Sequence, residues 1–340
     1  MPRSSSAATS STTSSSTHHH SVWPGLIVCA VIGLVCIGLS KLVPNLSAML
    51  VAIILGVVAR NTINIPVAFD KGIGVAAKSV LRWGVVLLGL QVSLGEILGL
   101  GWGVLITVIA CVAITFVSTI ALGKALKVDH ELTTLIAAGF SICGAAAVAG
   151  AQGVVRATQE KVAAAVALVV LFGTLMIPGG LLIINVFGLG DTGAGIFIGG
   201  STHEVAQVVA TGGIAGGGAL LTTAITVKLA RVACLAPVIM SLSATQKKGP
   251  AEDSRPPLLP LFVVGFIAMM LIATTGWVPE SVMDVAHFLQ QFLLATAMFA
   301  LGLGVHFKSL IKLGGRPVIL GALSTVIICA VALIGVALVA

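Results

Sequence analysis

GGSTHEVAQVVATGG, residues 199–213, gathers polar side chains within a chain that otherwise consists mostly of Leu, Val, Ile, Ala and Gly. Hydrophobic residues occupy 58% of the 340 positions and charged residues only 9%. A soluble domain carries about 25% charged residues. Several windows around the quoted stretch exceed the ~18 apolar residues that mark a membrane span. The sequence therefore predicts an all-α polytopic membrane protein.

Eleven hydrophobic segments follow one another along the chain. They cover residues 24–43, 45–59, 79–98, 103–126, 132–151, 162–187, 194–212, 219–243, 258–276, 285–305 and 316–340. We expect residues 23–340 to form one transmembrane domain. Residues 1–22 are rich in Ser and Thr, too polar to fold, and have no signal-peptide pattern, so we expect a disordered cytoplasmic tail.

The basic residues between the segments predict the orientation. If the N-terminus is inside and every segment crosses once, twelve Lys and Arg lie in inner loops and only Lys41, Arg156 and Lys161 in outer loops. A second topology stays open, in which residues 132–151 and 194–212 are re-entrant hairpins that enter from opposite sides. Arg156 and Lys161 then return to the inner side, and nine spans remain.

Two internal repeats suggest how the segments are related. LLGLQVSLGEIL (87–98) and FALGLGVHFKSLI (299–311) align at an offset of 213 and would run in opposite directions, as in an inverted-repeat transporter. SICGAAAVAG (141–150) and STHEVAQVVA (201–210) align at an offset of 60. Each is expected to open a helix after a Gly-containing break, so the sequence predicts two interrupted helices that face one another near mid-membrane.

The first break predicts an anion site. A helix that begins inside the membrane exposes N–H groups without carbonyl partners, and an anion can satisfy them with the help of the helix dipole. Its candidate ligands are Ser141, Cys143 and Gly144, where the glycine allows close backbone approach. Close packing of small residues between helices explains the same pattern without a ligand.

The second break carries the stronger signal. Its candidate ligands are Ser201, Thr202, His203, Glu204 and Gln207. Ser201 and Glu204 fit an S-x-x-E capping box, which closes a helix start without substrate, but this box leaves His203 and Gln207 unexplained. An imidazole titrates near pH ~6.5, so His203 is the candidate proton sensor, and anion affinity should rise as the pH falls. The rival interpretation makes His203 a neutral donor that orients Glu204.

The next segment contains two cations, Lys228 and Arg231, deep within an apolar run. A charge inside the membrane is costly and requires a partner. We expect Glu204 to neutralise one of them and an anionic substrate to bind the other, so both belong to the predicted site. The alternative is a salt bridge that only stiffens the bundle.

Other chemistries lack their motifs. The six cysteines form no CxxC pair, so neither a metal site nor a disulfide framework is expected, and no cofactor is predicted. The chain has no HExxH, GxSxG or Walker A pattern, so we expect neither enzymatic activity nor ATP-driven transport. The net charge of +7 reflects topology signals in loops rather than nucleic-acid binding.

Three stretches together resemble a known family. VLRWGVVLLGLQVSLGEIL (80–98), GFSICGAAAVAG (139–150) and residues 199–213, in this order, are similar to the YeiH-like family of bacterial inner-membrane proteins, which are described as sulfate exporters. The resemblance runs from about residue 24 to 340. It implies a distant relation to cation/proton antiporters and bile-acid-type symporters, and hence an inverted-repeat core with two interrupted helices.

The leading hypothesis is a secondary transporter that exports a small, sulfate-like anion, coupled to protons through His203 and Glu204. A cation/proton antiporter with Glu204 as the ion ligand is the alternative, although two cations beside one carboxylate argue against it. A membrane-embedded enzyme is a third reading. The expected partners are the anion and the lipid bilayer, and faces of small residues could also serve a homodimer.

Overall fold

The structure is a computed structural model that describes residues 21–42, 48–245, 261–305 and 314–339. All regular elements of these residues are helical. Seven helical runs are long and apolar enough to cross a membrane: Trp23–Leu42, Val67–Gln91, Trp102–Ala125, Glu160–Phe187, Gly218–Ala244, Glu280–Leu303 and Gly315–Val339. The predicted all-helical membrane protein is confirmed, whereas the tail lies outside the described residues up to residue 20.

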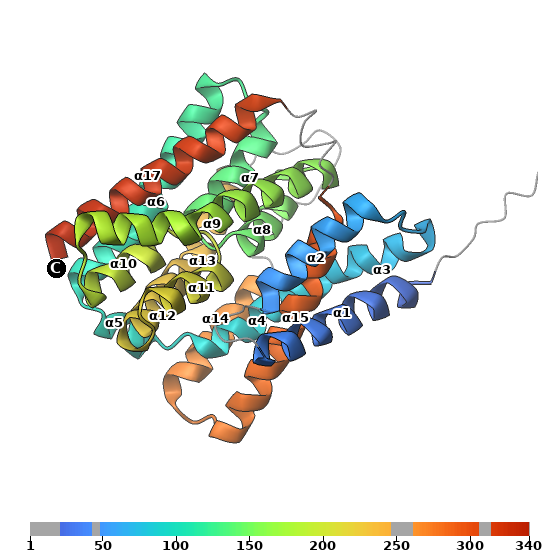
Figure 1. The fold of residues 1–340 in the computed structure, drawn as a ribbon, viewed down its shortest axis with the longest axis horizontal. Coiled ribbons are helices and arrows are strands. Elements are labelled where there is room, and N and C mark those ends of the chain that lie inside the picture. Colours follow the sequence, from blue (N-terminus) through green and yellow to red (C-terminus); the bar gives the residue numbers. More distant parts are fainter. Residues whose placement is uncertain (1–20, 43–47, 246–260, 306–313, 340) are drawn as a thin grey trace, which may run out of the picture.

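The helices form two groups that lie side by side (Figure 1). The smaller group contains α1 (Trp23–Leu42), α2 (Ala48–Thr62), α3 (Asp70–Val75), α4 (Leu81–Leu88), α14 (Leu261–Thr275) and α15 (Glu280–Leu303). A 3-10 turn (Val67–Phe69) precedes α3, a π-helical turn (Ala76–Val80) joins α3 to α4, and a second 3-10 turn (Gly89–Gln91) follows α4.

The larger group contains α6 (Trp102–Ala125), α7 (His130–Ser141), α8 (Ala145–Val155), α9 (Gln159–Phe187), α10 (Asp191–Ser201), α11 (Val205–Ala215), α12 (Gly218–Ala233), α13 (Leu235–Thr245) and α17 (Gly315–Val339). The short α5 (Leu94–Gly99) connects the two groups and contacts both α12 and α14. The chain therefore passes from the smaller group to the larger one at α5.

Small residues let the helices approach closely. Gly302 of α15 packs against the backbone of α2 at Gly56, and a side chain at either position would overlap the partner helix. Gly335 of α17 packs against the Thr107 side chain of α6, which a side chain at position 335 would overlap. Because lipid tails are as apolar as Leu, such backbone proximity replaces the hydrophobic effect as the source of helix association.

Helices of the first and second halves of the chain repeat at the longer of the two sequence offsets, 213 residues. α2 and α14 have 15 residues each, and both their starts and their ends are 213 residues apart. α6 and α17 also begin 213 residues apart. The contacts of the paired helices correspond as well: α2 packs against α15, and α14, which repeats α2, packs against α4. The matching motif at 299–311 is described only as far as residue 305.

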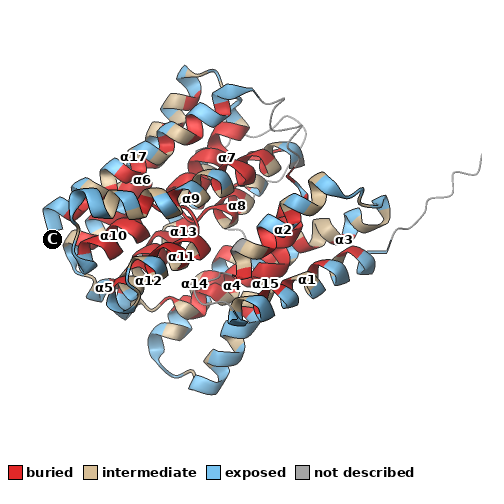
Figure 2. Cartoon of the chain, in the orientation of Figure 1, coloured by how far each residue is buried: buried red, intermediate tan, exposed pale blue. Residues whose placement is uncertain are grey.

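Burial follows the expectation for a membrane protein. Buried residues concentrate between the helices and where the central helices of the larger group meet (Figure 2). Large apolar side chains such as Ile27 and Val31 of α1 and Ile106 of α6 are more than half exposed, as a lipid-facing surface requires. Trp23 and Trp102 are the first residues of α1 and α6, Trp277 lies between α14 and α15, and Trp83 lies within the helical run Val67–Gln91.

Candidate functional site

The first interruption separates α7 from α8. α7 ends at Ser141, three residues follow, and α8 begins at Ala145. Gly144 has φ +79°, a conformation that L side chains rarely adopt, and it directly precedes the first turn of α8. The break therefore follows Ser141, instead of preceding it as the sequence analysis expected.

The second interruption has the same construction. α10 ends at Ser201, three residues follow, and α11 begins at Val205. Ser141 and Ser201 are both the last residue of a helix, and their hydroxyls donate to the carbonyls of Ala137 (2.6 Å) and Phe197 (2.7 Å). The offset of 60 thus holds for the three-dimensional structure, but both serines close the first helix and do not open the second.

Glu204, and not Ser201, caps α11. The Glu204 backbone N–H donates to Oε1 of Gln207 at 3.1 Å, in the reciprocal arrangement of a capping box. The predicted Ser201–Glu204 box was therefore wrong by three residues. The physical reason is that the Ser201 hydroxyl donates to the Phe197 carbonyl four residues earlier in its own helix, α10, and so does not cap α11.

The first interrupted pair folds back on itself. Lys161, in the first turn of α9, lies 2.8 Å from Asp129 Oδ1 and 2.9 Å from Glu131 Oε2, at the start of α7. α7 and α9 therefore begin at the same end of the larger group. α8 must return the chain to that end, so residues 130–155 form a hairpin, called the first hairpin below.

The second interrupted pair folds back as well. Gly195 of α10 packs against Leu220 of α12, and Gly199 packs against Ala224, so α10 and α12 run in parallel from a common end. Gly212, near the end of α11, contacts Leu221 at the start of α12. Residues 191–215 thus form the second hairpin.

The two hairpins approach from opposite ends of α9, and their tips meet halfway along it. α9 has 29 residues and so extends over about 43 Å. The first hairpin precedes its beginning and the second follows its end. Gln207 packs on Gly173, the middle residue of α9, where any side chain would overlap it. Glu204 Oε1 accepts a hydrogen bond from the Ala145 N–H at 3.1 Å, which joins the tips directly.

Lys228 is completely buried beneath these tips. Its Nζ donates to the carbonyl oxygens of Ile142 (2.8 Å), Thr202 (2.9 Å) and His203 (2.6 Å). These are the three bonds that an ammonium group can donate. Lys228 therefore satisfies backbone carbonyls from both hairpins at once.

Arg231, one turn further along α12, acts in the same way. Nε donates to Ser141 O (3.3 Å), Nη1 to Gly199 O (3.1 Å) and Thr202 O (2.8 Å), and Nη2 to Phe140 O (3.1 Å) and Ser141 O (3.0 Å). The five bonds use all five guanidinium N–H groups. The acceptors lie at the C-terminal ends of α7 and α10, where carbonyls lack helical partners and the dipole is negative.

The expected ion pair with Glu204 is therefore not formed. Both cations bond to backbone carbonyls, and the Glu204 carboxylate bonds to the Ala145 N–H. Of the charged side chains in the described part of the chain, three are buried: Lys228, Arg231 and Glu204. The tips thus contain two basic side chains and one acidic side chain. Two C-terminal and two N-terminal helix ends also meet here, and the negative and positive partial charges of these ends roughly cancel.

Several polar atoms at the tips have unusual surroundings. Thr202 Oγ1 and Gln207 Nε2 are buried without a hydrogen-bond partner. His203 is also buried; its Nε2 lies 3.0 Å from Thr325 Oγ1, and its ring contacts Phe140 with centroids 4.5 Å apart. Free donors beside an excess of positive charge form a setting suited to an anion.

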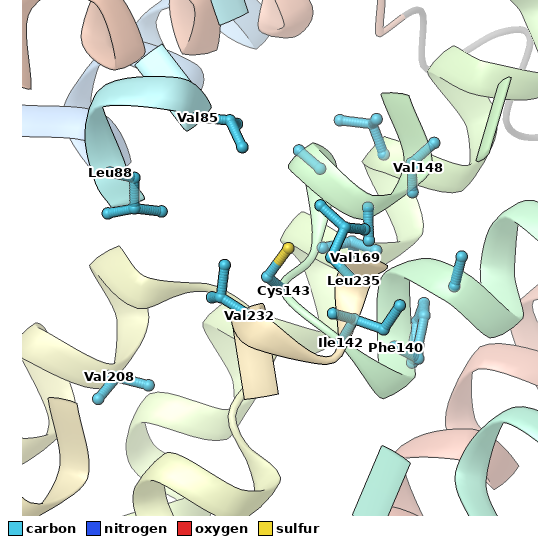
Figure 3. Packing of buried hydrophobic residues seen from close by; sticks show 14 of the residues in the cluster. Val85, Leu88, Phe140, Ile142, Cys143, Val148, Val169, Val208, Val232 and Leu235 are labelled. Carbon is cyan, nitrogen blue, oxygen red and sulfur yellow. The ribbon is translucent and has the colours of Figure 1, made fainter. Parts of the chain in front are cut away.

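Apolar side chains surround the tips. Cys143 and Ile142 lie near Val169 and Leu235, while Val85 and Leu88 of α4 approach from the smaller group (Figure 3). Two cavities, of about 530 Å³ beside residues 188–193 and about 380 Å³ between α1, α2, α3 and α15, are both lined by residues away from the tips. Among the residues that the structure describes, no three His, Cys, Asp or Glu side chains lie together in a way that could hold a metal ion.

The structure brings together all ten predicted site residues, though in different roles. Ser141 and Ser201 contribute carbonyl and hydroxyl groups to helix ends, and Gly144 leaves room for the Glu204 side chain. Sequence reasoning missed Thr325 and Gly173. Thr325 follows Ser324 within an apolar run, a polar pair that could have drawn attention, whereas nothing in the sequence marks Gly173.

Comparison with known proteins identifies the family. Residues 24–321 match a family model described as conserved hypothetical protein 698. The chain is 44% identical over 315 residues to a UPF0324 membrane protein of Corynebacterium glutamicum, covering 92% of this chain and 91% of the relative. It is 37% identical over 284 residues to a UPF0324 membrane protein of Bacillus cereus, covering 82% and 80%.

A UPF0324 membrane protein of Listeria monocytogenes is 35% identical over 274 residues, covering 80% of this chain and 82% of that relative. No solved structure matches the chain. The YeiH-like family indicated by the three sequence motifs is the same family as UPF0324. The chain therefore belongs to the UPF0324 family of membrane proteins.

Proposed function

We propose that this protein is a secondary transporter of a small, sulfate-like anion, which binds where the tips of the two hairpins meet. One observation carries the proposal: Lys228 and Arg231 are both buried at this point, and Glu204 is the one buried carboxylate among the described residues. An uncompensated charge inside a membrane is costly. A bound anion would remove this cost.

The first turns of α8 and α11 would supply the ligands. Both helices begin at the tips, so their free N–H groups and positive dipole ends point toward the same region. Thr202 Oγ1 and Gln207 Nε2 add side-chain donors that have no partner in this conformation. Lys228 and Arg231 would act through their charge, because their own N–H groups are occupied by carbonyls.

The proposed topology has nine spans and two re-entrant hairpins. It is supported by the position of Lys161 beside Asp129 and by the parallel packing of α10 and α12. In this topology fourteen Lys and Arg lie in inner loops and only Lys41 in an outer one. With the N-terminus inside, the distribution follows the positive-inside rule more closely than that of eleven spans.

The proposed architecture is an inverted repeat. The offset of 213 between the bounds of α2 and α14, the exchanged contacts with α15 and α4, and the two hairpins at an offset of 60 all support it. Five proposed spans, from α2 to α12, lie between corresponding positions of the first repeat, so its copies run in opposite directions. Movement of the larger group against the smaller one would expose the tips to each side in turn.

Proton coupling belongs to the proposal, and its two candidate carriers are Glu204 and His203, since both side chains are buried at the tips. A cation/proton antiporter remains the second candidate, because Glu204 is a buried carboxylate of the kind that such proteins use. Its hydrogen bond to Ala145 and the two nearby cations make it a poor cation ligand in this conformation. No enzymatic role is proposed.

Flux through proteoliposomes tests the function. The purified protein should catalyse saturable exchange of at least one anion among sulfate, sulfite, a taurine-like sulfonate and a dicarboxylate, and the rate should depend on pH. Protein-free liposomes are the control. Flux that requires Na⁺ and is indifferent to every anion would replace the proposal with the cation antiporter.

A further inference from the structure

The Glu204 carboxylate occupies the place where a helix start would bind an anion. Its Oε1 lies 3.1 Å from the backbone nitrogen of Ala145, the first residue of α8. The contact joins two hairpins and spans 59 residues of sequence. Gly144 makes it possible, because any side chain at this position would overlap the Glu204 side chain.

Glu204 also stands between both helix starts. Its side chain accepts the backbone N–H of Gln207 in the capping box of α11, and the same carboxylate accepts the Ala145 N–H in the first turn of α8. A carboxylate in this position does what a bound anion does, since it accepts a free N–H and lies at the positive end of a dipole. An anion bound between the two starts would have to take the same place.

An independent observation indicates that the region is built for more than this carboxylate. Thr202 Oγ1 and Gln207 Nε2 are donors that remain without partners on the same hairpin tip, although both side chains are fully buried. One carboxylate also leaves one of the two buried positive charges uncompensated. Glu204 therefore leaves two hydrogen-bond donors and one basic side chain of the site without an anionic partner.

The charged and titratable groups around Glu204 come from three elements. α12 contributes Lys228 and Arg231, the first hairpin contributes the Cys143 thiol, and His203 precedes Glu204 in the chain. Glu204 itself is 5% exposed, and its neighbour Val205 and Ala146 of α8 are partly exposed. The carboxylate thus lies at the edge of the buried cluster, where it can reach a proton donor.

We propose that Glu204 is a tethered anion that competes with the transported anion for the first turn of α8, and that its protonation vacates the site. This inference rests on the proposed function. The carboxylate takes one proton from a hydronium ion of the solvent, which becomes water, and is converted to a neutral carboxyl group. That group leaves the Ala145 N–H, and the anion takes its place, so one proton is bound for each anion bound.

The coupling between protonation of Glu204 and anion binding determines how anion affinity depends on pH, in direction and in size. Protonation of Glu204 favours anion binding, so affinity rises as the pH falls. Because one proton is involved, affinity should change by up to tenfold per pH unit over the range in which the carboxyl group is ionised in the empty protein.

Sulfate binding to the full-length protein in detergent, measured by calorimetry between pH 5 and 8, tests the inference. Glu204→Gln keeps an oxygen that can accept the Ala145 N–H but has no charge. We expect this variant to bind sulfate at pH 8 at least tenfold more tightly than the parent and with no pH dependence. Glu280→Gln removes an exposed carboxylate at the start of α15 and should retain the parental slope.

A second variant distinguishes an effect on sulfate binding from a loss of folding. Glu204→Asp keeps the charge but is too short to reach Ala145, so it should also bind sulfate more tightly at pH 8. If both variants bind sulfate more weakly than the parent, or keep its slope, the tethered-anion inference is overturned while the transporter proposal stands. If neither the parent nor the variants bind or exchange any anion of the panel, both proposals fail together.

Discussion

Lys161 Nζ lies 2.8 Å from Asp129 Oδ1, and this contact fixes the direction of the chain between them. α7 and α8 have 12 and 11 residues, so together they could extend over about 35 Å if they continued in one direction. The contact instead brings the start of α9 to the start of α7. Residues 130–155 therefore return to the end at which they begin, and the ion pair lies at the base of this first hairpin.

Labelling of single cysteines should confirm this return. Glu160 is exposed at the start of α9, and in the nine-span topology Glu160→Cys faces the cytoplasm. A membrane-impermeant maleimide should therefore label it in inverted vesicles and not in intact cells. Leu42→Cys, 79% exposed at the end of α1, should show the opposite pattern. Labelling of Glu160→Cys from outside would restore the eleven-span topology.

Asp129 should make the stability of the first hairpin pH-dependent. Its hydrogen bond with Lys161 lowers the pKa of the carboxyl group below its ordinary value of 3.8. The stabilisation is therefore complete above pH 3.8 and is lost as the pH falls through the lower, folded-state pKa. Because the Asp129 side chain is 50% exposed, we expect at most about 1 kcal/mol. Unfolding in detergent at pH 7 and pH 3 should show this loss in the parent and a smaller one in Asp129→Asn.

Lys228→Met should destabilise the fold before it affects anion binding. The substitution leaves three carbonyls without their donor, and each unsatisfied buried group costs about 1–3 kcal/mol. Thermal unfolding in detergent should show a large loss for Lys228→Met and a small one for Lys161→Met near the surface. Equal losses would contradict the role of Lys228 at the helix ends.

Thr202→Val should weaken anion binding without destabilising the fold. The Thr202 hydroxyl is buried without a partner, so its removal should leave stability unchanged or increase it. Anion affinity should fall about 10- to 100-fold, because a hydrogen bond to a charged group contributes about 1.5–3 kcal/mol. Thr296→Val removes an equally unpartnered hydroxyl on α15 of the smaller group and is the matched control. A similar affinity in both variants would place the anion elsewhere.

His203→Gln should retain the pH dependence of sulfate binding. Gln can still bond to Thr325, which lies 3.0 Å from His203 Nε2, but it cannot titrate. If Glu204 carries the coupled proton, the slope of affinity against pH should match that of the parent between pH 5 and 8. A flat profile in His203→Gln together with an unchanged one in Glu204→Gln would move the proton switch to His203.

The sequence by itself determined that this protein lies in a membrane and in which two segments its helices are interrupted. Hydropathy is a property of composition, so a chain with 9% charged residues could only be a membrane protein. The repeat that pairs Ser141 with Ser201 is also found in the structure, because similar small and polar residues end a helix in the same way wherever they occur. The polar residues of 199–213 were likewise brought together, since they lie within two helical turns of one another.

Only the tertiary structure decided what these residues contact. The direction of each hairpin depended on Lys161 meeting Asp129 and on Gly195 meeting α12, contacts between segments that no local pattern relates. The partners of Lys228 and Arg231 were backbone carbonyls, which every residue possesses and which no sequence distinguishes. A carbonyl becomes a partner for a buried cation only where a helix ends, and the meeting of two such ends is a property of the packed fold.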